Sequence, residues 1–171
     1  LPAGKLPPIE RQRARILIID DDAMWRYLTS DALRERGFEV EEADSAHEVM
    51  ELLADWAPDL LIIDALMPEV DGFAVCRLLR DCPEHAALPI LMMTSLDDDN
   101  AIGRAYDSGA SDFFIKSTHW ALLTERIRHL LRMARMQDEL ASTSQRLVEA
   151  QTVGGISGYD YDLASGLVSG S

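Results

Sequence analysis

The sequence predicts an α/β fold, a doubly wound five-stranded parallel sheet that ends in an extended C-terminal helix. Two observations predict it. Short apolar runs, each about the length of one strand, alternate along the chain with longer segments whose apolar residues recur at helical spacing. Most of these runs are apolar at consecutive positions, as in strands buried on both faces, and parallel strands need helical crossovers.

Five runs are predicted to be strands. Four are nearly continuous in apolar residues, which predicts strands at Ile16 to Ile19, Leu60 to Ile63, Ile90 to Met93 and Phe113 to Ile115. The fifth, Phe38 to Ala43, alternates between apolar and polar residues and therefore predicts an edge strand.

Helical segments lie between these runs. Gly37 and Gly109 each follow such a segment and predict its C-terminal stop, while Pro83 interrupts the third. Ser45 and Glu48 have the spacing of a capping box, which predicts that the second helix begins at Ser45.

The fifth helix is expected to begin near Ser117 or Thr118 and to continue to Gly154, because its apolar residues keep a 3-4 spacing without Gly or Pro. This spacing favours a two-stranded coiled coil; the alternative is a solvent-exposed helix or one packed back on its own domain. The expected organisation is an N-terminal arm or linker (1–14), the α/β domain (15–133), a coiled-coil linker (134–153) and the start of another element (154–171).

Composition restricts the function. The 171 residues include 30 acidic and 16 basic side chains, a formal charge of −14, which argues against nucleic acid or anionic lipid as the main ligand. No apolar run approaches the roughly 20 residues that a membrane helix needs. The only two cysteines do not form a C-x-x-C pair, so a reducing cytoplasm is the expected location.

Polar residues follow the predicted strands where each strand ends. The carboxyl ends of parallel strands lie at one edge of the sheet, where ligands bind in this architecture. Carboxylates packed this closely repel one another unless a divalent cation lies among them, and oxygen ligands suit Mg²⁺. The expected set of carboxylates, hydroxyl and ammonium is Asp20, Asp21, Asp64, Thr94 and Lys116.

Asp64 is the candidate nucleophile of this set. It ends the middle strand, and an aspartate beside Mg²⁺ can attack phosphorus to form an acyl phosphate. Lys116 would offset charge on the transferred oxygens, and Thr94 would donate a hydrogen bond to the phosphoryl group. Taken singly, each of these acids is more simply a helix N-cap or a solvated loop residue.

Four segments, ILIIDDD, PDLLIIDALMPEVDG, PILMMTS and GASDFFIK, occur in this order over about residues 15 to 133. Together they resemble the receiver domain of bacterial two-component response regulators. The resemblance implies a flavodoxin-like sheet of strand order 2-1-3-4-5 and a phosphorylation-dependent signalling switch. Its phosphoryl donor would be a histidine kinase or phosphotransfer protein.

The resemblance also implies residue roles. Asp64 would be the phosphoacceptor. Asp21 and Asp64 would bind Mg²⁺ directly, the backbone carbonyl of Leu66 would be a third ligand, and Asp20 would act through water.

Thr94 and Lys116 would contact the phosphoryl group, and Phe113 would change rotamer when Thr94 moves. One departure concerns the residue after the lysine, which is usually a proline in a cis peptide and here is Ser117, so the aim of the lysine is in doubt. Trp25 is expected to pack in the core; its alternative place is the mouth of the phosphorylation pocket.

The C-terminal segment LASTSQRLVEAQTVGGISGYDYDLASG resembles the entry to a PAS domain. Such regulators often carry downstream domains that make or hydrolyse cyclic dinucleotides, but this chain itself is not expected to be an enzyme beyond its own phosphorylation and dephosphorylation. The expected assembly is a homodimer through the fifth helix and coil. The main alternative is a phosphorylation-independent dimerisation module, and a hydrolase is disfavoured because Leu66, two residues after Asp64, cannot act as a general acid.

Overall fold

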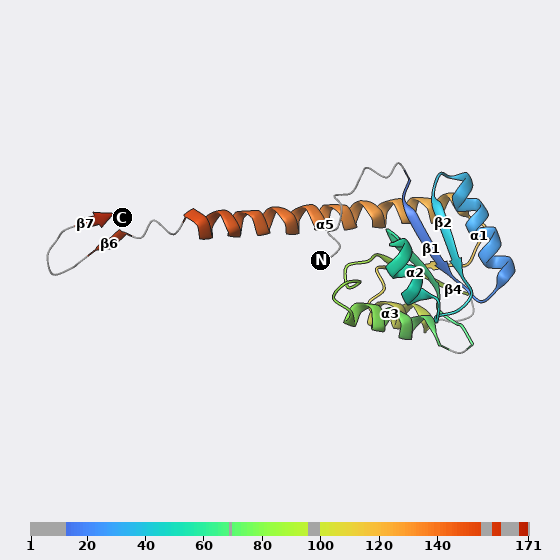
Figure 1. Cartoon of the computed structure of the whole chain (residues 1–171). Helices are drawn as coiled ribbons and strands as arrows, with labels where there is room; N and C mark the ends of the chain where they lie inside the picture. The colour runs from blue at the N-terminus through green and yellow to red at the C-terminus, as the bar shows by residue number, and fades with distance from the viewer. Residues whose placement is uncertain (1–12, 69, 96–99, 155–158, 162–167, 171) are drawn as a thin grey trace. The chain divides into compact units, whose positions relative to one another are not determined.

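The computed structural model describes residues 13–68, 70–95, 100–154, 159–161 and 168–170. Five parallel strands form one sheet in the order β2-β1-β3-β4-β5, and helices connect them (Figure 1). The predicted fold class is therefore confirmed, including the strand order and the long C-terminal helix.

The strands are short and in regular register. They span β1 (Arg15–Ile19), β2 (Glu39–Ala43), β3 (Leu60–Asp64), β4 (Ile90–Thr94) and β5 (Asp112–Ile115). Every residue of β3 and β4 is buried, whereas β2 lies at one edge and has Glu39 and Glu41 exposed on either side of the buried Val40. The predicted edge position of β2 is thus confirmed, and β5, whose run is as apolar as those of the central strands, lies at the other edge with only Phe114 of its residues buried.

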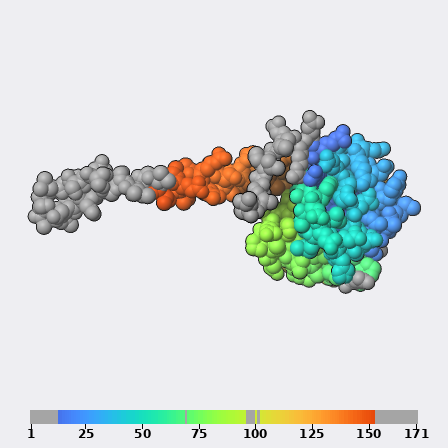
Figure 2. Space-filling view, in the orientation of Figure 1, coloured from blue at the N-terminus to red at the C-terminus, as the bar shows by residue number. Residues whose placement is uncertain are grey.

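Helices cover both faces of the sheet. They span α1 (Ala23–Glu35), α2 (Val49–Trp56), α3 (Gly72–Asp81), α4 (Ala101–Asp107) and α5 (Trp120–Gly154). One core cluster contains residues of α2, α3 and α4, and a second contains residues of α1 and α5. In the space-filling view α2 and α3 lie next to each other on the same face (Figure 2).

Alternate residues of each central strand enter opposite cores. Leu61 and Ile63 belong to the cluster with α2 to α4, while Leu60 and Ile62 belong to the cluster with α1 and α5. Full burial of each such side chain contributes about 1.5–3 kcal/mol. Because helices seal both faces, the carboxyl edge of the sheet is where polar side chains can collect.

The capping box at Ser45 was predicted wrongly. The second helix begins at Val49, its N-cap is Glu48, and no side chain caps it with a hydrogen bond. The residues between β2 and α2 form bends and turns, so an S-x-x-E pattern alone did not define the start. The two glycine stops are present, with φ of +92° at Gly37 and +90° at Gly109.

The chain divides into two compact units, residues 1–134 and 135–171. Helix α5 is continuous to Gly154 as predicted, and its residues from Arg135 belong to the second unit. In that unit β6 (Tyr159–Tyr161) and β7 (Val168–Gly170) pair antiparallel. Residues 1–12, most of the predicted arm, and most of the further element predicted at residues 154–171 lie outside the described residues. No described helix is both long and apolar enough to cross a membrane.

Candidate functional site

The acidic residues after β1 have three different environments. Asp20 is buried, and its Oδ1 accepts a hydrogen bond from the Asp22 backbone N–H at 2.9 Å. Asp21 is exposed. Asp22 is the N-cap of α1, where its carboxylate accepts hydrogen bonds from the backbone N–H groups of Met24 and Trp25. Asp22 therefore has the capping role, and Asp20 and Asp21 remain for the site.

Asp64 ends β3 and is 6% exposed. Its Oδ1 accepts a hydrogen bond from the Leu66 backbone N–H at 3.2 Å. The start of α3 passes close to this point, and a Cβ placed on Gly72 would lie only 2.1 Å from the Asp64 carbonyl oxygen. Because only glycine permits this approach, Gly72 allows the start of α3 to pack directly against the Asp64 backbone.

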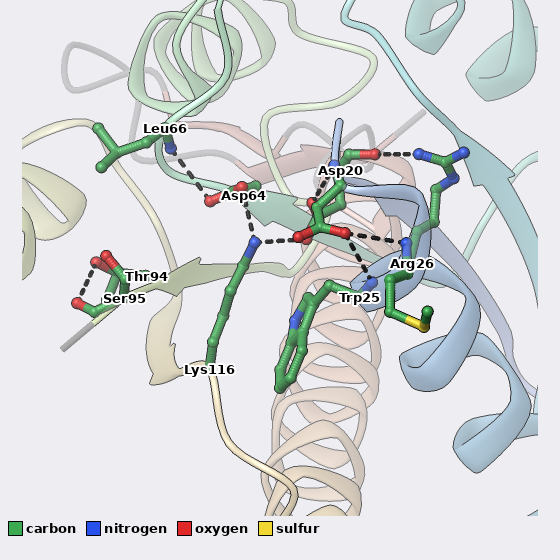
Figure 3. A network of polar contacts seen from close by, with 10 residues as sticks. Asp20, Trp25, Arg26, Asp64, Leu66, Thr94, Ser95 and Lys116 are labelled. Carbon is green, nitrogen blue, oxygen red and sulfur yellow. Dashed lines mark hydrogen bonds and ion pairs between the residues drawn. The ribbon is translucent and has the colours of Figure 1, made fainter.

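Lys116, which follows β5, joins the carboxylates. Its Nζ donates a hydrogen bond to Asp64 Oδ2 at 2.8 Å and lies 2.8 Å from Asp20 Oδ2 (Figure 3). The Asp20 contact is an ion pair without hydrogen-bond alignment. One ammonium thus bridges two buried carboxylates that come from different strands.

Burial and the neighbouring charges shift the pKa values of Asp20 and Lys116. Burial raises the pKa of Asp20 above its ordinary value of 3.8; the nearby Asp64 charge acts in the same direction, and Lys116 opposes both. Burial alone would lower the pKa of Lys116, but its contacts with Asp20 and Asp64 outweigh burial and raise it. The ammonium therefore stays protonated at neutral pH, next to carboxylates that it only partly neutralises.

Thr94, Leu66 and Phe113 were also predicted to lie near this site. Thr94 is buried at the end of β4, where its Oγ1 donates to the Ser95 carbonyl at 3.3 Å and its own carbonyl accepts from the Lys116 backbone N–H. Leu66 reaches Asp64 through its backbone N–H. Phe113 is partly buried on β5, and its ring lies 5.7 Å from that of Tyr106 in an edge-to-face arrangement.

Three residues near the site were not identified from the sequence as belonging to it. Gly72 was read only as part of a motif, and nothing in its sequence context reports the close approach. Arg26 donates from Nη1 to the Asp20 carbonyl at 2.6 Å, and its position one turn into a helix after an acidic run was the available signal. Trp25, for which the pocket mouth was only the alternative, has its ring centroid 5.9 Å from Lys116 Nζ.

The residues fit a hard divalent cation. Oxygen atoms of Asp20, Asp21 and Asp64 lie within 4.8 Å of one another. Three carboxylates this close carry more negative charge than one ammonium can balance, and an all-oxygen donor set suits Mg²⁺. The donor chemistry therefore matches the ion that the sequence predicted.

Comparisons with known proteins agree with this geometry. The sequence profile of the family described as "Response regulator receiver domain" matches residues 16–128. Response regulator MprA of Mycobacterium ulcerans is 37% identical over 130 residues, which are 76% of this chain and 55% of that protein. Response regulator PleD of Caulobacter vibrioides is 34% identical over 145 residues, 85% of this chain and 31% of that protein. The chain thus spans about half, or less, of the length of these relatives.

Solved structures show the same fold. The signal receiver domain of a signal transduction histidine kinase from Syntrophus aciditrophicus has a TM-score of 0.64 and 33% identity, covering 70% of this chain and 90% of that chain. The chemotaxis response regulator CheY4 of Vibrio cholerae has a TM-score of 0.63 and 25% identity, covering 69% of this chain and 98% of that chain. This chain belongs to the response regulator receiver domain family.

Proposed function

We propose that this chain is a phosphorylation-dependent switch in which Asp64 accepts a phosphoryl group from a histidine kinase or phosphotransfer protein. The observation that carries the proposal is the bridging of Asp64 and Asp20 by the Lys116 ammonium, beside the exposed carboxylate of Asp21. Such a cluster combines a nucleophile, a cation and a metal-binding set at one edge of the sheet.

The roles of the side chains follow from their positions. A carboxylate oxygen of Asp64 forms the new P–O bond as the bond from phosphorus to the donor nitrogen breaks. Lys116, already in contact with Asp64 Oδ2, would move its ammonium contact to a phosphoryl oxygen, where the negative charge then lies. The Thr94 hydroxyl would exchange its Ser95 carbonyl partner for another phosphoryl oxygen.

The metal set of the proposal is Asp21, Asp64 and the backbone carbonyl of Leu66, with Asp20 acting through water. When bound, Mg²⁺ would neutralise charge on the transferred oxygens. Arg26 donates a hydrogen bond to the Asp20 carbonyl, and Gly72 allows α3 to pack against the Asp64 backbone.

The proposed output path runs from Thr94 to Phe113. Phe113 packs edge-on against Tyr106 of α4, which is 53% exposed, so a rotation of the Phe113 ring would change the surface formed by α4 and β5. Helix α5 continues from the sheet to Gly154 and would carry the signal onward.

Dimerisation through α5 is part of the proposal. Apolar side chains are exposed along its distal part, including Leu140 at 71% and Leu147 at 61% exposed. Exposed apolar residues at this spacing support a coiled-coil partner helix. We further propose that a PAS-like element follows the coil and that an output domain, for example one acting on cyclic dinucleotides, receives the signal.

Labelling tests the phosphoacceptor. After incubation with acetyl phosphate and Mg²⁺, we expect the intact mass to rise by one phosphoryl group that maps to Asp64, and Asp64→Asn to abolish the gain. Asp59→Asn is the matched control, because Asp59 lies just before the same strand at its opposite end and should not affect labelling. Labelling that persists in Asp64→Asn at another residue would refute the assignment.

Sedimentation separates the switch from its alternative. The alternative, a phosphorylation-independent dimerisation module, rests on the same exposed residues of α5. The switch predicts that Mg²⁺ with beryllofluoride, a mimic of the phosphoryl group, changes self-association in analytical ultracentrifugation. Unchanged self-association in a protein that does label at Asp64 would favour the alternative.

A further inference from the structure

Lys116 has a third neighbour besides its two carboxylates. Trp25 lies in the first turn of α1, and its ring centroid is 5.9 Å from the Lys116 Nζ. Figure 3 shows the indole beside the Lys116 side chain, on the side of the site occupied by Asp20. An ammonium at this distance from an indole face is attracted by the electrons of the ring.

The indole is itself held in place. Its ring centroid lies 5.6 Å from that of Trp120, the first residue of α5, and both rings pack against the core cluster that contains α1 and α5. The Nε1 atom of Trp25 is buried and has no hydrogen-bond partner among the described residues. The ring therefore occupies its place through packing and through its face rather than through its polar edge.

The residue after Lys116 is not a proline, so it does not restrain the backbone at that point. The residue that follows is Ser117, and every described peptide bond is trans. The Lys116 backbone N–H bonds to the Thr94 carbonyl, but the flexible four-carbon side chain has to be aimed by its surroundings. Trp25 touches Lys116 at one end of the β5–α5 connection and Trp120 at the other.

We propose that Trp25 is a positioning residue, whose ring face holds the Lys116 ammonium over Asp64 for phosphoryl transfer. This role rests on the proposed function. Asp20 and Asp64 attract the ammonium only until a metal ion and a phosphoryl group engage them, whereas the indole is uncharged and keeps its attraction throughout. The Trp25 ring thus orients the Lys116 side chain, as a rigid residue after the lysine would otherwise do.

Two substitutions of Trp25 test this role through the rate of labelling by acetyl phosphate at saturating Mg²⁺. Loss of an attraction of this kind should slow Trp25→Leu by about threefold to tenfold. Trp25→Phe keeps an aromatic face and should recover most of the rate. Trp56→Leu is the matched control: Trp56 also lies under a cation, that of Arg15 at 5.4 Å, but packs in the other core.

A double-mutant cycle shows whether Trp25 acts through Lys116. In a Lys116→Ala background, Trp25→Leu should cause no further slowing, because the ammonium is already gone. Equal slowing in both backgrounds, or a Trp25→Leu rate equal to wild type, would overturn the inference while leaving Asp64 as phosphoacceptor. Absence of any wild-type labelling would instead overturn the proposed function itself, together with this role.

Fluorescence gives a readout independent of rate. In a protein that carries Trp56→Phe and Trp120→Phe, Trp25 is the sole tryptophan, since the chain has three. Its emission should change when Lys116 is replaced by Ala and when Mg²⁺ with beryllofluoride is added. Emission that responds to neither would show that the ring and the ammonium do not interact in solution.

Discussion

Two partly buried cations at opposite edges of the sheet have very different partners. At the carboxyl edge, Lys116 faces two carboxylates that repel each other. Before the amino ends of β4 and β5, Arg80 of α3 donates to neutral groups: the carbonyls of Gly109 at 2.7 Å and Leu88 at 2.8 Å, and the Ser111 hydroxyl at 3.2 Å.

The difference separates stability from function. The Arg80 guanidinium joins the end of α3 to the turns that contain Leu88 and Gly109. Without it, the carbonyls of these two residues would lose a hydrogen-bond donor. The Lys116 cluster instead leaves like charges close together, an arrangement that disfavours folding and suits the binding of a cation and a phosphoryl group. We therefore expect removal of the Arg80 side chain and removal of the Asp20 charge to change stability with opposite signs.

The largest expected effect is at the amino edge. Arg80→Ala removes hydrogen bonds to several backbone carbonyls and should lower the free energy of unfolding by about 3 kcal/mol in urea titrations. Arg80→Lys keeps the charge without the planar fork and should recover only a minor part. Labelling at Asp64 by the folded fraction should stay unchanged; a slower rate there would show that the edges are coupled.

Gly72→Ala should combine both effects at the carboxyl edge. Its Cβ would meet the Asp64 carbonyl at 2.1 Å, so we expect a loss of about 2 kcal/mol in unfolding free energy together with slower labelling. Gly103→Ala is the matched control, because a Cβ there meets nothing within 4 Å and lies within α4. A Gly72→Ala protein with wild-type stability and labelling would contradict the close approach.

Asp20→Asn should stabilise the protein. Burial raises the pKa of Asp20, so the folded state binds this proton more tightly than the unfolded chain, and stability falls as pH rises from 3.8 through the raised value. In metal-free buffer the variant should gain about 1 kcal/mol at neutral pH. The gain should shrink as the pH is lowered toward 3.8, and its measurement is urea unfolding over that range.

A gain that does not depend on pH would show that the buried charge of Asp20 is not its source. The same variant should also lose much of the stabilisation that Mg²⁺ gives to wild type, because Asp20 belongs to the proposed metal set.

The sequence predicted this fold well because its signals are local. A continuous apolar run such as Leu60 to Ile63 identifies a buried strand, and the residue after each parallel strand must lie at the shared edge. That rule alone predicted that Asp20, Asp64 and Lys116 lie close together.

Other features depended on contacts that no local pattern reports. The partners of Arg80 are mostly backbone carbonyls, one of them 29 residues away. Every residue has a backbone carbonyl, so the sequence does not indicate which of them Arg80 contacts. The contact of Trp25 with Lys116 joins the start of α1 to the end of β5. The wrong start of α2 has a related cause, because Ser45 had the right spacing but the turn before Val49 took a different backbone path.

Neighbouring aromatics on β5 restrict how the proposed switch can move. Phe113 packs on the side of α4, whereas Phe114 is 4% exposed and packs in the opposite core, the one that contains Leu123 of α5. Sliding the whole strand would disrupt both layers at once, while turning the Phe113 ring about its own side-chain bonds leaves Phe114 undisturbed. The motion that disrupts the least packing is therefore a rotation of the Phe113 side chain, which affects only one face of β5.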